Sequence, residues 1–289
     1  MRFMKSNFQK SLFILALQVV CALVQAQPSQ PDPNFHLYLL IGQSNMSGRG
    51  ALDAQSKETN AQVFMLTKDL EWKPATDPLH FDKPFAAVGP GLAFGKAMAQ
   101  ANPKIRIGLI PCAVGGTSIK VWVPGAKDKA TKTHPYDDML RRVLVAQQQG
   151  VLKGILWHQG EADRADDATY THSLIELIAR LRKDLNAPNV PFVAGELGTF
   201  NPKNRAVTEK FNVMLDALQG NEKNYACVSS GGLKDRGDHL HFNAASARML
   251  GKRYAETMLK LQSDMNSQAQ IKPHQNSPDQ PFNKQMPNR

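Results

Sequence analysis

Cysteine, aromatic residues and long apolar runs are scarce in this sequence. Three cysteines in 289 residues cannot support a small disulfide-stabilised scaffold. Cys112 and Cys227 lie in apolar strand-like runs, so we expect two buried free thiols rather than a bridge. No run of eighteen or more apolar residues follows the first thirty positions, which excludes a membrane-spanning helix after them. At 42% the hydrophobic content is too high for a disordered chain and suffices for one large domain or two small ones.

The first 26 residues have the order of a secretory signal peptide. Arg2, Lys5 and Lys10 precede a mostly apolar run from Leu12 to Val24, and the small residue Ala26 follows. This order predicts export, either to a periplasm or out of the cell, with cleavage after Ala26.

The basic excess is moderate once this segment is set aside. The full sequence has a formal charge of +10, and removal of residues 1–26 takes away three basic and no acidic residues, which leaves +7. The charges are dispersed rather than gathered on one periodic face, so we expect neither a nucleic-acid partner nor stable membrane insertion of the mature chain. Attraction to an acidic polysaccharide or to an anionic membrane surface stays open.

Short apolar segments alternate with segments of helical periodicity. The predicted strands span residues 35–41, 105–111, 152–158, 191–197 and 225–229, with a further strand at 63–67 near an edge. The predicted helices span residues 92–100, 136–149, 168–185, 207–218 and 244–261. Strands that are apolar almost throughout are buried on both faces, as in a parallel sheet covered by helices. Residues 27–262 are therefore predicted to form one α/β domain, and the polar, proline-containing segment 263–289 a disordered tail.

Four polar clusters follow predicted strands. They are Gly42-Gln43-Ser44-Asn45-Met46, Gly115-Gly116-Thr117-Ser118, Gln159-Gly160-Glu161 and Asp238-His239-Leu240-His241-Phe242-Asn243. Each cluster alone fits a turn, a glycine loop or a helix cap. Open parallel α/β sheets bind ligands at the carboxyl ends of their strands, so we expect the four clusters to meet at one edge of the sheet.

Two of the clusters contain the groups that activate a nucleophile. The hydroxyl of Ser44 is a poor nucleophile unless a neighbouring imidazole takes its proton, and His241 is the candidate base. Asp238 lies three residues before His241 and can fix its tautomer. His239 is the competing imidazole, but it is adjacent to Asp238, and adjacent side chains rarely face each other.

The other two clusters contain candidate donors for the negative charge that develops on an acyl oxygen. Each preorganised donor is worth roughly 3 kcal/mol in the barrier. The backbone N–H groups of Ser44 and of Gly115 or Gly116 can act in this way, as can the side-chain amide of Gln159.

In this order and combination, with Trp122 after the second cluster and His158 before the third, the clusters resemble the four sequence blocks of the SGNH hydrolases. More narrowly, they resemble the branch that contains sialate O-acetylesterases and the acetylxylan esterases of carbohydrate esterase family 6. Gln43 before the serine, and Gln159 where the wider family commonly has asparagine, are both typical of this branch.

The resemblance implies a flavodoxin-like three-layer α/β/α sandwich with a central, mostly parallel sheet. It also implies catalysis without a cofactor, by Ser44 as nucleophile, His241 as base and Asp238 as the carboxylate partner of the base. The implied oxyanion hole consists of Ser44, Gly115 or Gly116, and Gln159.

Two assignments stay open. Glu161 lies at the same edge of the sheet and is an alternative to Asp238 as the acid of the triad. Trp122 either stacks on a sugar ring or is buried beneath its loop. No catalytic metal is expected, because His158 and Glu161 lack an obvious third ligand and no His-Glu-x-x-His pattern occurs.

The function expected from these observations is that of an exported serine esterase. It would remove O-acetyl groups from a carbohydrate of the acetylxylan or sialate type through an acetyl-enzyme intermediate, with an acetylated oligo- or polysaccharide as its partner. Two alternatives remain, a general short-chain acyl esterase and a carbohydrate-binding protein without catalytic activity.

Overall fold

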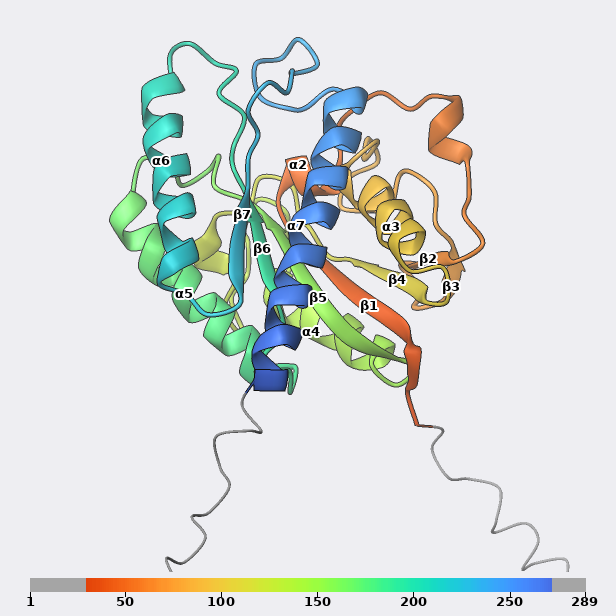
Figure 1. The fold of residues 1–289 in the computed structure, drawn as a ribbon. Helices are drawn as coiled ribbons and strands as arrows, with labels where there is room; N and C mark the ends of the chain where they lie inside the picture. The colour runs from red at the N-terminus through yellow and green to blue at the C-terminus, as the bar shows by residue number, and fades with distance from the viewer. Residues whose placement is uncertain (1–29, 272–289) are drawn as a thin grey trace, which may run out of the picture.

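Seven strands form one sheet between two layers of helices (Figure 1). The structure is a computed structural model that describes residues 30–271, so the predicted signal peptide at 1–26 and residues 272–289 of the predicted tail lie outside it. The sheet order is β3-β2-β4-β1-β5-β6-β7, and only β3 runs antiparallel to its neighbour. The strands are β1 (Asp32–Gly42), β2 (Val63–Leu66), β3 (Trp72–Pro74), β4 (Arg106–Pro111), β5 (Gly150–His158), β6 (Phe192–Gly195) and β7 (Tyr225–Val228).

The longer helices cover both faces of this sheet. They are α3 (Pro90–Ala101), α4 (Pro135–Ala146), α5 (Asp167–Asp184), α6 (Arg205–Ala217) and α7 (Ala244–Ile271). The short ones are α2 (Ser44–Ser47) and the 3-10 helices η1 (Ala54–Lys57), η2 (Ile119–Val121) and η3 (Leu218–Gly220). Helices α4, α5 and α6 pack on one face, and α3 and α7 pack on the other (Figure 1). The predicted three-layer sandwich with a mostly parallel sheet is confirmed.

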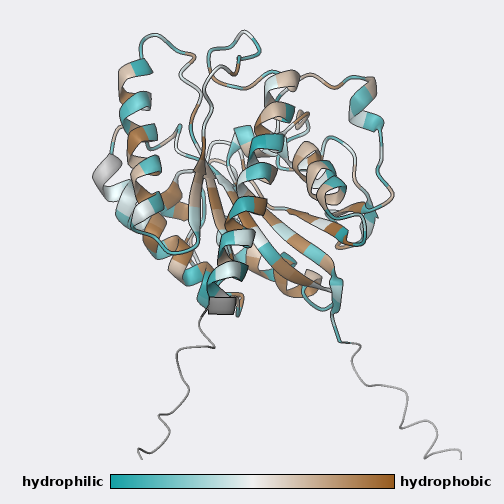
Figure 2. Ribbon diagram, in the orientation of Figure 1, coloured by the Kyte–Doolittle hydropathy of each residue, from teal (hydrophilic) through white to brown (hydrophobic). Residues whose placement is uncertain are grey.

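The sheet is buried on both faces because successive side chains of a strand point to opposite sides. In β1, Leu37 and Leu39 join the core beneath α4, α5 and α6, whereas Tyr38 and Leu40 join the core beneath α3 and α7. Figure 2 shows the same arrangement, with apolar residues concentrated along the strands. The nearly continuous apolar strands therefore reflect two cores that share one sheet.

All six predicted strands and all five predicted helices are present, with shifted ends. The short antiparallel strand β3 was not predicted, since three residues are too few to show a periodic pattern. The predicted end of the last helix at residue 261 is wrong, because α7 continues to Ile271. Residues 263–271 lack an apolar stripe, but they contain no proline or glycine to end a helix, and the first proline comes at Pro273.

The two cysteines of the domain are both free, as predicted. Cys112 is buried and Cys227 is half-buried. Burial raises the pKa of the Cys112 thiol to about 11, so this group stays protonated at neutral pH. Within residues 30–271, no helix has both the length and the apolar character needed to cross a membrane.

The carboxyl ends of three neighbouring strands bring distant clusters together. Strand β1 lies between β4 and β5, and these strands lead into the clusters of Ser44, Gly115 and Gln159 respectively. Gly42 ends β1 with φ +126°, and a Cβ at this position would lie 2.1 Å from the carbonyl oxygen of His158. Only glycine permits this close approach, which turns the chain sharply into α2.

Candidate active site

Ser44 is the first residue of α2 and lies just beyond the central strand β1. The backbone N–H of Gln43 donates to the carbonyl oxygen of His158 at 2.9 Å, which ties the start of this turn to β5. Ser44 is 7% exposed, so it lies at the edge of the sheet with little contact to solvent. Its backbone N–H makes no hydrogen bond within the described chain, as expected for the first residue of a helix.

The structure brings Ser44, His241 and Asp238 into one hydrogen-bonded chain. The Nε2 atom of His241 lies 3.0 Å from Oγ of Ser44, across 197 residues of sequence. Its Nδ1 atom lies 2.8 Å from Oδ2 of Asp238. When Nδ1–H donates to this carboxylate, Nε2 is left as the acceptor for the serine proton, which is the tautomer that a general base requires.

The loop around His241 keeps the carboxyl of Asp238 ionised. Partial burial by itself raises the pKa of Asp238, but hydrogen bonds from the backbone N–H and ring of His241 and from the backbone N–H of Leu240 outweigh it. The net effect is a pKa of Asp238 below its usual value. A negative charge is therefore held beside the imidazole, where it stabilises the imidazolium form.

The two competitors for these positions lie elsewhere. Glu161 does not contact His241; its Oε1 accepts from Nδ2 of Asn45 at 2.5 Å and lies 4.0 Å from Nε2 of His158. His239 turns away from Asp238, with its backbone N–H donating to Oδ2 of Asp235 at 2.6 Å and a side chain that is 64% exposed. Asp238 is therefore the carboxylate that contacts the ring of His241.

The glycine pair after β4 lies against Ser44, but its two N–H groups differ. A Cβ on Gly115 would lie 3.4 Å from Cβ of Ser44, so the loop closely approaches the serine. The N–H of Gly115 already donates to Oδ2 of Asp82 at 2.9 Å. The N–H of Gly116, with φ +86°, has no hydrogen-bond partner in the described part of the chain. Of the two predicted donors, Gly116 is the free one.

Contrary to expectation, the side-chain amide of Gln159 is not free to act as a donor. Its Nε2 lies within hydrogen-bond distance of the carbonyl oxygen of Thr117 at 3.0 Å, Oε1 of Gln43 at 3.2 Å and Oδ2 of Asp163 at 2.5 Å. The amide has two hydrogens, and these three acceptors already compete for them. Gln159 therefore links the first, second and third clusters to one another.

Asp163 and Asp82 support the glycine loop and were missed in the sequence. Asp163 also accepts from Oγ of Ser118 at 2.5 Å and from the N–H of Ile119 at 2.9 Å. It lies only two residues after Glu161, a proximity that was a usable signal. Asp82 is in an irregular loop with no motif around it, so nothing in the sequence singled it out.

Arg49 is the buried counter-charge of Asp82. Its NH2 atom lies 2.8 Å from Oδ2 of Asp82, and the two side chains are 5% and 1% exposed. Burial by itself raises the pKa of Asp82, but the hydrogen bond and charge of Arg49, with further hydrogen bonds from Ser47 and Gly115, bring the pKa below its usual value. The carboxylate that holds Gly115 is consequently ionised.

Trp122 has no face open to a sugar, which excludes the stacking role considered for it. The indole is 0% exposed and packs edge-to-face against Trp157 with ring centroids 5.3 Å apart. Its Nε1–H donates to Oγ1 of Thr117 at 3.3 Å. The large ring fills the core under the glycine loop and supports it from below.

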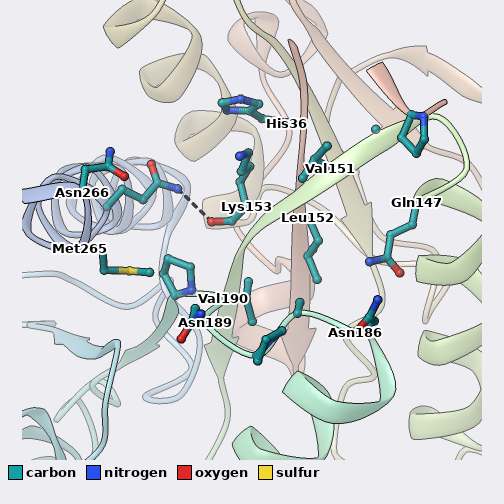
Figure 3. A pocket seen from close by; sticks show the side chains of 16 residues that line it. His36, Gln147, Val151, Leu152, Lys153, Asn186, Asn189, Val190, Met265 and Asn266 are labelled. Carbon is teal, nitrogen blue, oxygen red and sulfur yellow. Dashed lines mark hydrogen bonds between the residues drawn. The ribbon is translucent and has the colours of Figure 1, made fainter. Parts of the chain in front are cut away.

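A cavity of about 560 Å³ lies at the opposite, amino-terminal edge of the sheet (Figure 3). His36 of β1 and Lys153 of β5 line it, together with residues of α7 such as Met265. None of the predicted site residues reaches it. Within residues 30–271, no group of three His, Cys, Asp or Glu side chains is placed to hold a metal ion.

A doubly wound α/β sheet that carries a hydrogen-bonded Ser-His-Asp chain at its carboxyl edge is typical of several classes of hydrolase. Residues 34–260 match the family described as "Carbohydrate esterase, sialic acid-specific acetylesterase". The chain belongs to this family, and its enzyme class is that of the carboxylic ester hydrolases. The suspected resemblance to the sugar-deacetylating SGNH branch is thereby confirmed.

Individual relatives agree with the family. A protein of Arabidopsis thaliana named "Probable carbohydrate esterase At4g34215" is 32% identical over 253 residues, which are 79% of this chain and 92% of that protein. The crystal structure of the Arabidopsis protein has a TM-score of 0.69 and covers 79% of this chain and 99% of its own. The crystal structure of NanS is 18% identical with a TM-score of 0.64, covers 81% of this chain and 99% of its own, and shows the shared fold.

Proposed function

We propose that this protein is an exported serine esterase that removes O-acetyl groups from a carbohydrate, of acetylxylan or sialate type, through an acetyl-enzyme intermediate. The observation that carries the proposal is the chain of contacts from Oγ of Ser44 to Nε2 of His241 and from Nδ1 of His241 to Asp238. Membership of a carbohydrate esterase family supports an acetylated carbohydrate as the substrate.

In the acylation step, Oγ of Ser44 attacks the carbonyl carbon of the acetyl group while Nε2 of His241 takes the hydroxyl proton. The carbonyl oxygen becomes an oxyanion, and the unpartnered N–H groups of Ser44 and Gly116 are the donors available to it. Collapse of the tetrahedral intermediate breaks the bond to the sugar oxygen. His241 returns its proton to this oxygen, and the deacetylated sugar leaves.

In the deacylation step, a water molecule attacks the acetyl group on Ser44, and His241 takes a proton from that water. The second tetrahedral intermediate releases acetate and restores the serine hydroxyl. Asp238 keeps its negative charge throughout, which holds the ring of His241 in one tautomer and stabilises its protonated form in both steps.

Ser44→Ala tests the proposal directly. We expect acetate release from acetylated xylan or O-acetylated sialic acid to fall by about 10⁴-fold or more, because the nucleophile is lost while the fold is kept. Binding of the deacetylated sugar should remain close to that of the wild type.

A substrate panel separates the alternatives. It contains acetylated xylan, O-acetylated sialic acid and short p-nitrophenyl esters. Activity confined to the hydrophobic esters would favour a general short-chain acyl esterase. Equally slow acetate release by the wild type and by Ser44→Ala would favour a carbohydrate-binding protein without catalysis.

A further inference from the structure

A buried polar cluster of Asn45, Glu161 and His158 adjoins Ser44 and the segment of His241. Asn45 is 3% exposed, His158 is 0% exposed and the side chain of Glu161 is 6% exposed. None of the three is part of the chain of contacts from Ser44 to Asp238. Buried polar groups are costly unless they are satisfied, so their arrangement calls for a physical reason.

The side-chain amide of Asn45 holds both neighbours of His241. Its Nδ2 donates to the carbonyl oxygen of Leu240 at 3.1 Å, and its Oδ1 accepts from the N–H of Phe242 at 3.1 Å. Asn45 itself follows Ser44 in α2. One amide therefore joins the residue after the serine to the residues on either side of the imidazole, and it sets the separation of Oγ and Nε2. We refer to Asn45 and these contacts as the Asn45 clamp.

The clamp works only if the amide faces one way. If the amide group were rotated by half a turn, its NH2 would face the N–H of Phe242 and its oxygen would face the carbonyl of Leu240, and both contacts would become repulsive. Glu161 adds a third contact that favours the same orientation, because its Oε1 accepts from Nδ2 of Asn45 at 2.5 Å. A carboxylate oxygen accepts hydrogen bonds and cannot donate them when ionised, so it selects the NH2 side of the amide.

Glu161 lies close to His158, the last residue of β5. The hydroxyl of Tyr254 donates to the carbonyl oxygen of Trp157 at 2.9 Å, so at 3.1 Å it accepts from Nδ1–H of His158. The Nε2 atom of His158 then carries no proton and makes no hydrogen bond with Oε1 of Glu161, which lies 4.0 Å away. Asn45 is thus the hydrogen-bond partner of Glu161 within the described structure. The ring of His158 also packs against Phe242, with centroids 5.6 Å apart.

We propose that Glu161 is a positioning residue for ester hydrolysis, which orients the amide of Asn45 so that the clamp holds His241 against Ser44. The carboxylate partner of His241 is then Asp238 alone. This inference rests on the proposed function for its catalytic consequence and on the contacts of Asn45 for its structural one.

Three substitutions at two positions test it kinetically, with Asp238→Asn as the reference. Glu161→Gln keeps an oxygen acceptor for Asn45, so kcat should stay within about tenfold of the wild type, whereas Asp238→Asn should lower kcat by about 10⁴-fold. Glu161→Ala and Asn45→Ala should each lower kcat by about 10²-fold through misplacement of His241, with KM little changed. Because Glu161 acts through Asn45, the variant that carries both Glu161→Ala and Asn45→Ala should lose no more kcat than Asn45→Ala alone.

Amide hydrogen exchange at Phe242 supplies a measurement that needs no turnover. The N–H of Phe242 should exchange roughly tenfold or more faster in Asn45→Ala and Glu161→Ala, and at nearly the wild-type rate in Glu161→Gln and Asp238→Asn. This result would stand even if the protein hydrolysed no ester, so failure of the clamp and failure of the proposed function are distinguishable.

Three outcomes would overturn the proposal. A loss of kcat in Glu161→Gln as large as that in Asp238→Asn would make Glu161 the triad acid. Multiplying losses in the double variant would mean that Glu161 and Asn45 act separately. Unchanged exchange at Phe242 in Glu161→Ala would show that Glu161 does not hold the clamp.

Discussion

Burial decides how much a single ion pair contributes to this protein. Arg49 and Asp82 are 2.8 Å apart with side chains 5% and 1% exposed. Arg106 and Asp32 are 2.9 Å apart, but their side chains are 50% and 40% exposed. Water and salt screen the second pair, whereas loss of one partner from the first leaves an uncompensated charge inside the protein. Asp82 also anchors Gly115, so the buried pair connects stability to the shape of the active site.

Asp82→Asn should lower the free energy of unfolding by about 3–5 kcal/mol, because Arg49 remains buried without a counter-charge. Asp32→Asn is the matched control, and it should leave the free energy of unfolding nearly unchanged. Urea denaturation of both variants beside the wild type measures the difference. Equal losses in the two variants would contradict the importance assigned to burial.

At the scale of elements, the active site depends on how three strands end. Parallel neighbours present their carboxyl ends at one edge, so β1, β4 and β5 place their following loops side by side. The chain must then leave β1 sharply enough for α2 to lie over β5. Gly42 makes this turn, and its backbone lies against the carbonyl group of His158.

Gly42→Ala should therefore unfold the active-site edge or the whole domain. A Cβ at this position would lie 2.1 Å from a backbone oxygen, and the φ of +126° is strained for any residue with a side chain. We expect a loss of more than about 4 kcal/mol of stability, measured as a fall in the melting temperature.

Gly220→Ala is the control for this substitution, since a Cβ there meets nothing within 4 Å. Its melting temperature should stay near that of the wild type. If both variants melted at the same temperature as the wild type, the close approach of β1 and β5 at Gly42 would not contribute to stability.

For the whole molecule, two buried groups give the stability opposite dependences on pH. Burial raises the pKa of Asp77 to about 7, because the charge of Arg248 and a hydrogen bond from the backbone of Gly89 do not outweigh it. The folded protein thus holds a proton that the unfolded chain releases at about pH 4. Stability therefore falls as the pH rises from about 4 to about 7. Burial lowers the pKa of His80 to about 4, so the unfolded chain binds the extra proton and stability rises with pH.

Asp77→Asn should remove the first of these effects and leave the second. A neutral amide of the same shape has no charge to bury, so the variant should be more stable than the wild type at pH 8, by up to about 4 kcal/mol for three pKa units. Near pH 4 the difference should vanish, because Asp77 of the wild type is then protonated in the folded state. Melting temperatures across pH 4–8 test this, and a difference independent of pH would contradict it.

The sequence by itself determined the class of fold and the positions of the main chemical groups. Apolar strand patterns and helical periodicity are local, so the strands and helices could be predicted along the chain, apart from β3 and the polar end of α7. The rule that parallel strands gather their carboxyl ends at one edge then predicted that the cluster of Ser44 would meet the segment of His241 and Asp238. The contacts between these three side chains agree with that prediction.

Only the tertiary structure decided how each polar group at that edge is used. Whether Gly115 or Gly116 keeps a free N–H depends on Asp82, 33 residues away, and the direction of the Gln159 amide depends on Thr117 and Asp163. The burial of Trp122 likewise depends on which rings pack around it. Hydrogen-bond partners and buried area are set by segments distant in sequence, so no local pattern contains them, and they appear only when the chain is folded.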